Sequence, residues 1–169
     1  MSNIIKMIGH LQSPKELLLA YEAIKQRMQD LGYSSSHTDP VGQYAEHLVA
    51  KLFSAQRTRN GTAGCDLISH DNVRIEVKGR VARRDGYVPK TYIMDSNVQS
   101  QFDYLVYIVF DKNYEVLRAV GMTVELFKQV ANYVKHVNSA GKWVYKASEK
   151  NMQQPGVDDL TQDLRELGE

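Results

Sequence analysis

An uninterrupted run of large apolar and aromatic residues over 104–110, Tyr-Leu-Val-Tyr-Ile-Val-Phe, constrains the fold of this chain most. A strand with one face in water would alternate polar and apolar residues, and this run does not alternate. The run therefore predicts a central β-strand that is covered on both faces. Together with the helical patterns on either side of it, it predicts an α/β protein in which helices flank a mixed central sheet.

Other elements follow from turn and cap signals. After the central run, the sequence predicts a turn at 112–113, a strand over 115–122, a helix over 124–135 capped by Thr123, and a short strand over 143–145. Before it, the predicted order is two helices and then a hairpin. The whole order is α-α-β-β-β-β-α-β within a single domain of residues 1–169.

A hairpin is predicted over 64–79, because two short strands, 64–69 and 73–79, flank the turn-forming residues His70-Asp71-Asn72. If the hairpin is centred on Asp71, residues at equal distances before and after Asp71 pair with each other, as Leu67 does with Ile75. Side chains alternate along a strand, so the apolar residues should share one face. These are Cys65, Leu67, Ile75 and Val77.

The other face of this hairpin carries Asp66, Glu76 and Lys78, with Asp66 directly opposite Glu76. Opposed side chains are about 5 Å apart, and opposed like charges destabilise a sheet. A magnesium ion, which prefers oxygen ligands, would reverse the sign of that interaction. Lys78 would then hold a water or offset charge on a phosphate. The alternative is a solvated hairpin face with ordinary surface charges.

A third carboxylate comes from the predicted helix 41–54. Its polar stripe does not include Glu46, whose neighbours at i+3, i+4 and i+7 are apolar. A carboxylate on that side needs a partner, because burying an unpaired charge is costly. Glu46 is therefore either a glutamate at the rim of the core or part of the metal site, directly or through water.

This layout, with helix-borne Glu46, then Asp66, then Glu76-Val77-Lys78, resembles the catalytic layout of the PD-(D/E)XK nuclease superfamily. The resemblance implies a restriction-endonuclease-like αβββαβ core with an added N-terminal helix. It also implies Mg²⁺-dependent phosphodiester cleavage, for which Mn²⁺ can substitute. The metal ligands would be Asp66, Glu76 and the carbonyl of Val77. One departure is Cys65, which stands where the motif has proline.

The chain is similar, more closely, to small stand-alone bacterial proteins described as restriction-endonuclease-like. The resemblance spans residues 38–165 and consists of an ordered set of short motifs. These are Gly42-Gln-Tyr-Ala-Glu46, Gly64-Cys-Asp66, Glu76-Val-Lys-Gly-Arg80, Phe102-Asp-Tyr-Leu-Val106 and Pro155-Gly-Val-Asp-Asp-Leu-Thr161.

Basic residues gather next to the predicted carboxylate site, although the net charge of the chain is only +1. A phosphate-backbone substrate requires such a segment. The predicted nucleic-acid contacts are Arg80, Arg83, Arg84 and Lys90, on a long loop from 80 to about 97. The alternative is an ordinary polar loop. The acids concentrate instead in a C-terminal tail over 155–169.

The N-terminal helix is predicted over 14–31, between the cap Ser13-Pro14 and Gly32. It carries a heptad-like apolar seam. The seam consists of Leu17, Tyr21, Ile24, Met28 and Leu31. Two roles stay open for it: packing on the core of the domain, or a two-fold homodimer contact, which suits a nuclease that cuts both strands of a duplex.

Composition and motifs exclude several classes. No apolar run is long enough to span a membrane, and a single cysteine rules out a disulfide framework and indicates a reducing cytoplasm. No zinc finger, helix-turn-helix or aromatic single-strand platform is visible. We therefore predict a nuclease that acts on nucleic acid, with double-stranded DNA as the expected partner. The alternatives are a structure-selective nuclease, or a non-catalytic nucleic-acid-binding or assembly protein that retains the fold.

Overall fold

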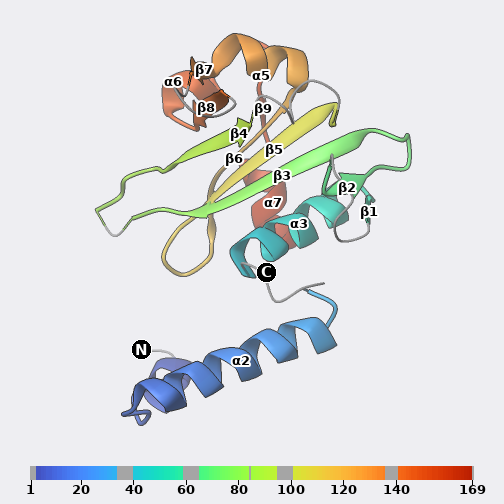
Figure 1. The fold of residues 1–169 in the computed structure, drawn as a ribbon. Helices are drawn as coiled ribbons and strands as arrows, with labels where there is room; N and C mark the ends of the chain where they lie inside the picture. The colour runs from blue at the N-terminus through green and yellow to red at the C-terminus, as the bar shows by residue number, and fades with distance from the viewer. Residues whose placement is uncertain are drawn as a thin grey trace. The chain divides into compact units, whose positions relative to one another are not determined.

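The structure is a computed structural model that describes residues 3–33, 40–58, 65–83, 85–94, 101–135 and 141–168. The chain divides into two compact units, Met1–Pro40 and Val41–Glu169. Each unit is described by itself below (Figure 1).

The first unit holds helices α1 (Asn3–Ile8) and α2 (Pro14–Asp30). Ser13 and Glu16 form a capping box at the start of α2. At its end, Gly32 has φ +74° and the N–H of Tyr33 donates to the carbonyl of Met28, which is a Schellman motif. The predicted helix is therefore confirmed. No described residue of α2 is buried, and Leu17 and Ile24 of the predicted seam are 45% and 49% exposed.

The second unit is built on a six-stranded mixed sheet in the order β1-β2-β3-β5-β6-β9. Its strands are β1 (Gln56–Arg57), β2 (Leu67–Ile68), β3 (Arg74–Val81), β5 (Tyr104–Phe110), β6 (Val116–Thr123) and β9 (Asp158–Asp159). Strands β3 and β5 are parallel and every other pair is antiparallel. From Leu105 to Phe110 every residue of β5 is fully buried, as the apolar run predicts.

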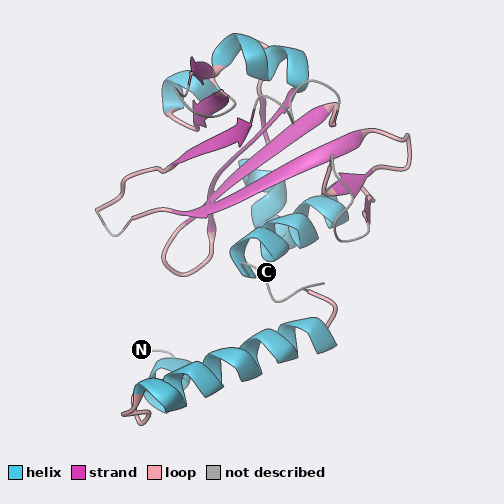
Figure 2. Cartoon of the chain, in the orientation of Figure 1, coloured by secondary structure: helices cyan, strands magenta, loops and turns pink. Residues whose placement is uncertain are grey.

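Two layers cover this sheet (Figure 2). Helices α3 (Pro40–Leu52) and α7 (Thr161–Leu167) pack against one face, where they contact Val106, Ile108 and Phe110. The other face, with Leu105, Tyr107 and Val109, packs against helix α5 (Val124–Val130) and a three-stranded sheet. This small sheet has the order β4-β8-β7, with β4 (Lys90–Met94), β7 (Asn132–Val134) and β8 (Lys142–Lys146). The predicted α/β class with a mixed sheet is thus confirmed.

Two predicted boundaries are wrong. Helix α5 is capped by Thr123 as predicted but ends at Val130 rather than near 135, because Asn132–Val134 form strand β7 against β8. That pairing supplies hydrogen bonds which compete with continued helix. The predicted loop over 80–97 is also interrupted. Strand β3 runs to Val81, and Lys90–Met94 form β4 through long-range pairing with β8.

The acidic C-terminal segment is folded as far as residue 168. It contributes strand β9, which pairs with β6, and helix α7, whose Leu164 is fully buried. A short helix, α6 (Glu149–Met152), precedes it. The observed order of elements is therefore longer than the predicted one, since α1, β1, β4, β7, α6, β9 and α7 were not expected.

Candidate active site

The site lies where strand β3 loses its neighbour on one side. Among the residues that the structure describes, strand β2 pairs with β3 only at Leu67↔Ile75 and Ile68↔Arg74. Further along, β3 is paired with β5 on its other side up to Val81. A pocket of about 310 Å³ opens along this free stretch. Its lining residues are Gly42, Glu46, Asp66, Glu76, Val77, Lys78, Gly79, Arg80, Tyr92, Ile93 and Met94.

The hairpin register is confirmed where β2 and β3 pair, but the pairing stops at Leu67, the residue after Asp66. The N–H of Asp66 donates to the carbonyl of Ile75, and its carboxylate Oδ2 accepts from the N–H of Val77 at 2.8 Å. The Asp66 side chain thus accepts a hydrogen bond from a backbone N–H, that of Val77, which regular pairing would have directed to a carbonyl of the neighbouring strand. The predicted direct opposition of Asp66 and Glu76 is therefore wrong, although both line the pocket.

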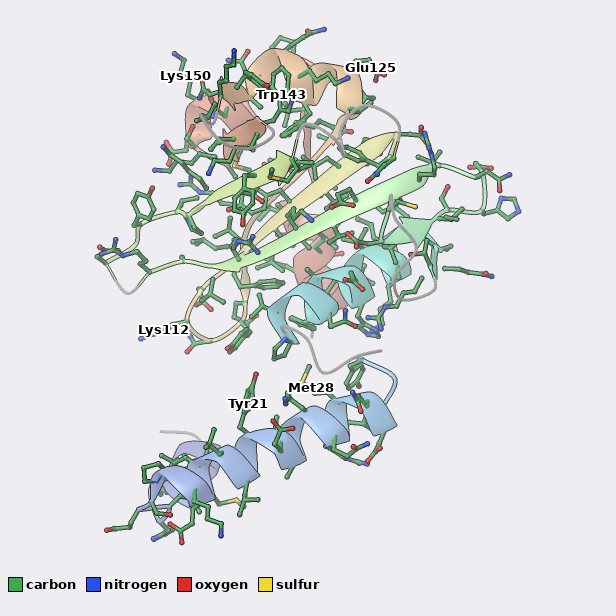
Figure 3. All side chains as sticks on the ribbon, viewed as in Figure 1. Tyr21, Met28, Lys112, Glu125, Trp143 and Lys150 are labelled. Atoms are coloured by element: carbon green, nitrogen blue, oxygen red, sulfur yellow. The ribbon has the colours of Figure 1, made fainter. Side chains whose placement is uncertain are left out.

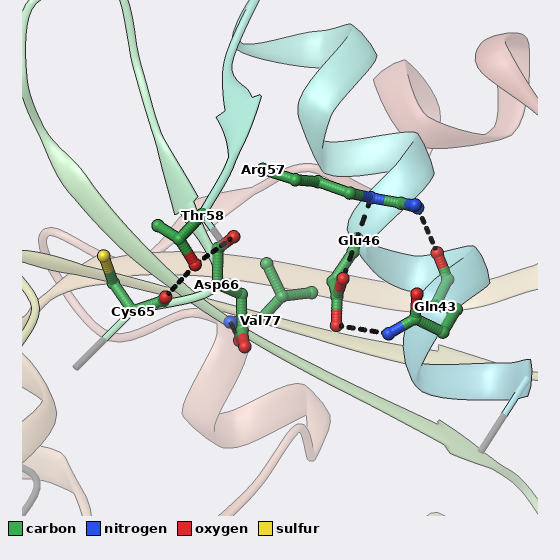
Figure 4. Close-up of polar contacts among 7 residues, drawn as sticks. All are labelled: Gln43, Glu46, Arg57, Thr58, Cys65, Asp66 and Val77. Atoms are coloured by element: carbon green, nitrogen blue, oxygen red, sulfur yellow. Dashed lines mark hydrogen bonds and ion pairs between the residues drawn. The ribbon is translucent and has the colours of Figure 1, made fainter. Parts of the chain in front are cut away.

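The face predicted for Cys65 from the alternation of side chains along a strand is also wrong. Leu67, Ile75 and Val77 share one face as predicted, and they pack beneath helix α3, whereas Cys65 packs against the core on the opposite face of the sheet. The irregular backbone at Asp66 explains the change of side, because each slip of one residue reverses the side-chain direction. Thr58 fixes this backbone by donating its hydroxyl to the carbonyl of Cys65 at 2.8 Å (Figure 4).

Glu76 and Lys78 lie on the same face of β3, and their side chains form an ion pair at 2.5 Å between Nζ and Oε1. Burial raises the pKa of Glu76 above its ordinary value. The ammonium of Lys78 opposes that rise and the charge of Asp66 adds to it. Glu76 is thus a carboxylate in a crowded acidic site, with Lys78 as its compensating cation.

Glu46 reaches the pocket from helix α3 and is held by two partners. Its Oε2 lies 3.7 Å from Nε of Arg57, and its Oε1 accepts from the side-chain amide of Gln43 at 3.3 Å. Arg57 in turn donates to the backbone carbonyl of Gln43 at 2.9 Å, which closes the network (Figure 4). Burial, followed by the charge of Asp66, raises the pKa of Glu46 to about 7, against the lowering effects of Arg57 and Lys78.

Sequence reasoning did not assign Gln43 and Arg57 to the site. Gln43 stands three residues before Glu46 on the same helix, a spacing that places the two side chains together and was available as a signal. Arg57 gave no such signal, because strand β1 is two residues long and its place beside Glu46 depends on long-range pairing.

The pocket has the chemistry of a cation site built from oxygen donors. Magnesium is typically bound by one or two carboxylates, with water or substrate phosphate completing its shell. Asp66, Glu76 and the Val77 carbonyl are donors of this kind, and all three residues line the pocket. Among the described residues, no three acidic, histidine or cysteine side chains converge as a ready-made ligand set. Hydrogen bonds from Lys78 and the Val77 N–H engage Glu76 and Asp66 instead.

Of the predicted nucleic-acid contacts, the structure places Arg80 at the pocket and Arg83 and Lys90 away from it. Arg80 lines the pocket, and its guanidinium donates to the carbonyl of Gly79. Arg83 and Lys90 lie outside the pocket, Arg83 in a surface ion pair with Asp85 and Lys90 exposed on β4. Arg84 lies outside the described residues.

Neither a protein-family model nor a curated protein sequence matches this chain. The resemblance to PD-(D/E)XK nucleases therefore stays a prediction that rests on the chain's own motifs. No described helix combines the length and the apolar character that crossing a bilayer requires.

Proposed function

We propose that this protein is a metal-dependent nuclease with a restriction-endonuclease-like core, and that it hydrolyses phosphodiester bonds of DNA. The observation that carries the proposal is the meeting of Glu46, Asp66, Glu76 and Lys78 in one pocket. They come from helix α3, from the residue before β2, and from β3. Two of these carboxyl groups have raised pKa values because they are crowded and buried, as is typical of functional sites.

Asp66, Glu76 and the carbonyl of Val77 would hold Mg²⁺, or Mn²⁺ in its place. When bound, such an ion polarises a phosphoryl oxygen and lowers the pKa of water. Lys78 carries no ligand atom. In the proposed reaction, the ammonium of Lys78 leaves its ion pair with Glu76. It then either binds the attacking water or offsets the negative charge that develops on the phosphate.

Glu46 has a separate role in the proposal. With a pKa of about 7 it exchanges a proton near neutral pH, and its links to Gln43 and Arg57 fix its carboxylate at the pocket wall. A carboxylate in this position can orient a water or accept its proton. Arg57 and Gln43 act through Glu46 and are positioning residues.

The test is cleavage of labelled duplex, single-stranded and branched DNA and of RNA with Mg²⁺, Mn²⁺ or EDTA. We expect cleavage that EDTA abolishes. Asp66→Asn and Glu76→Gln should each remove it, because each takes away a ligand charge. Lys78→Ala should lower the rate sharply while Mn²⁺ binding, followed by electron paramagnetic resonance, stays close to wild type.

The matched control is Glu125→Gln, which changes an exposed glutamate on α5 outside the pocket (Figure 3). It should leave both cleavage and Mn²⁺ binding unchanged. Wild-type rates in Asp66→Asn and Glu76→Gln would refute the proposal. Tight nucleic-acid binding with no metal-dependent cleavage of any substrate would favour the non-catalytic alternative.

A further inference from the structure

The outer face of the small sheet is a second charged surface beside the pocket. We use "outer face" for the side of β4, β7 and β8 that points away from the core formed by Thr91, Ile93 and Tyr145. By strand alternation it carries Lys90, Tyr92, Met94, Lys142, Val144 and Lys146. No acidic residue occurs in any of the three strands.

The register of this sheet places like charges together. Lys90 pairs directly with Lys146, and directly opposed like charges destabilise a sheet. Lys142 pairs with Met94, two positions from Tyr92. A polyanion would remove the repulsion, so the charge of this face is complementary to a phosphate backbone.

Exposed tyrosine rings lie among these cations. Tyr92 and Tyr87 are 50% and 41% exposed. The ammonium of Lys142 lies 5.2 Å from the centroid of the Tyr92 ring, and that of Lys146 lies 4.5 Å from the centroid of the Tyr87 ring. Each ammonium lies over the face of its ring, and the guanidinium of Arg83 also lies over the Tyr87 ring, 5.7 Å from its centroid. A cation that moves from the ring to a bound phosphate would leave that face to a base.

The outer face continues into the carboxylate pocket. Tyr92, Ile93 and Met94 line that pocket together with Glu76 and Lys78. From Lys90 to Met94 strand β4 advances about 13 Å. A nucleic-acid strand that lies along β4 over Tyr87, Lys90 and Tyr92 thus ends at the candidate active site.

We infer that the outer face binds an unpaired nucleic-acid strand and delivers it to the pocket. Bases in a duplex are stacked on one another and cannot reach a tyrosine ring, whereas unpaired bases stack on exposed aromatic side chains. This inference rests on the proposed function for what happens at the pocket, and it narrows the substrate to nucleic acid with a single-stranded arm or end. The platform was not visible in the sequence because its members come from segments about 50 residues apart, Tyr87 to Tyr92 and Lys142 to Lys146.

The test is binding in EDTA, which needs no catalysis. Fluorescence anisotropy with fluorescein-labelled dT 12-mer and with a 12-base-pair duplex would be measured over a range of salt. Tyr87→Ala/Tyr92→Ala should weaken single-strand binding at least about twentyfold, since one stacked base contributes roughly fivefold or more. The salt slope and duplex binding should stay as in wild type. Tyr87→Phe/Tyr92→Phe keeps both rings and should retain single-strand affinity.

Replacing the lysines should change the salt dependence of binding, which the tyrosine variants leave unchanged. Lys90→Ala/Lys142→Ala/Lys146→Ala should reduce the salt slope for the single strand by about 2, from roughly 0.7 for each lost phosphate contact. The matched control is Lys112→Ala/Tyr114→Ala, which changes an exposed lysine and tyrosine on the turn after β5, away from Trp143 in the small sheet (Figure 3). It should change neither affinity nor slope.

Several outcomes would overturn the inference: wild-type single-strand affinity in the folded Tyr→Ala pair, an equal loss for the duplex, or an equal loss in the control pair. The two proposals fail separately. Tyrosine-dependent binding without cleavage of any substrate in Mg²⁺ leaves this inference standing and refutes the nuclease. Cleavage with tyrosine-independent binding does the reverse.

Discussion

Replacing Glu46 with glutamine should stabilise the protein at alkaline pH, because the charge of Glu46 opposes folding. The pKa of Glu46 rises from its ordinary 4.5 to about 7 in the folded chain. Well below pH 4.5 the carboxyl is protonated in both folded and unfolded states and opposes nothing. As pH rises toward 7, the unfolded chain loses this proton more readily than the folded chain, so the free energy of unfolding falls.

The size of the effect follows from the two pKa values. Their difference of about 2.5 corresponds to roughly 3.4 kcal/mol at 1.36 kcal/mol per unit. The pocket is open to solvent, which screens the charge, so we expect about 1–2 kcal/mol. Glutamine is neutral throughout and retains groups that can hydrogen-bond Gln43 and Arg57. Glu46→Gln should therefore exceed the wild type by about 1–2 kcal/mol at pH 8 and nearly equal it at pH 4.5.

Urea unfolding in EDTA, followed by the fluorescence of the single tryptophan, Trp143, measures this difference. Adding Mg²⁺ at pH 8 should narrow it, because a cation held by Asp66 and Glu76 would attract the neighbouring charge of Glu46 and so bind the wild type more tightly than Glu46→Gln. Glu125→Gln, at an exposed position, should show no difference that depends on pH. An unfolding free energy of Glu46→Gln below that of wild type at pH 8, or a gain independent of pH, would refute the reasoning.

Three further changes test other parts of the structure. Gly79→Ala should cost about 1–3 kcal/mol in urea unfolding, because its Cβ would lie 2.9 Å from a methyl group and from a carbonyl oxygen of helix α3. Arg57→Ala removes a cation that lowers the pKa of Glu46, so half-maximal cleavage in a pH–rate profile should move to higher pH; an unmoved profile would exclude Arg57 as a positioning residue. We expect light scattering to show a homodimer, and Leu17→Glu/Ile24→Glu to give a folded monomer; a wild-type monomer would contradict the dimer contact.

The sequence predicted the elements whose pattern is local. The apolar run of β5, the caps of α2 and α5, and the hairpin register at Leu67↔Ile75 are all as expected. In each case neighbouring residues determine the outcome through side-chain period or capping. The same local logic grouped Asp66, Glu76 and Lys78, whereas Glu46 was added from a separate helix through the family resemblance; all four line the pocket.

What the sequence did not predict depends on pairing across long separations. Strand β4 contains the strand-favouring residues Thr91, Tyr92 and Ile93, a short signal within a basic segment, and it forms because β8 pairs with it some 50 residues later. Strand β7 replaces the end of a helix for the same reason. At Asp66 a single side chain accepts the Val77 N–H and changes the face on which Cys65 lies, which no strict alternation can anticipate.

The carboxylate pocket and the outer face of the small sheet each gather side chains of one charge. The pocket crowds Glu46, Asp66 and Glu76 together, and the adjoining outer face opposes Lys90 and Lys146. Each arrangement opposes folding when considered alone, and a net charge of +1 conceals both. A cation at the carboxylates would relieve the first, and a phosphate backbone on the lysines would relieve the second. A nucleic-acid strand bound together with a divalent cation would supply both partners at once, as the proposed nuclease reaction requires.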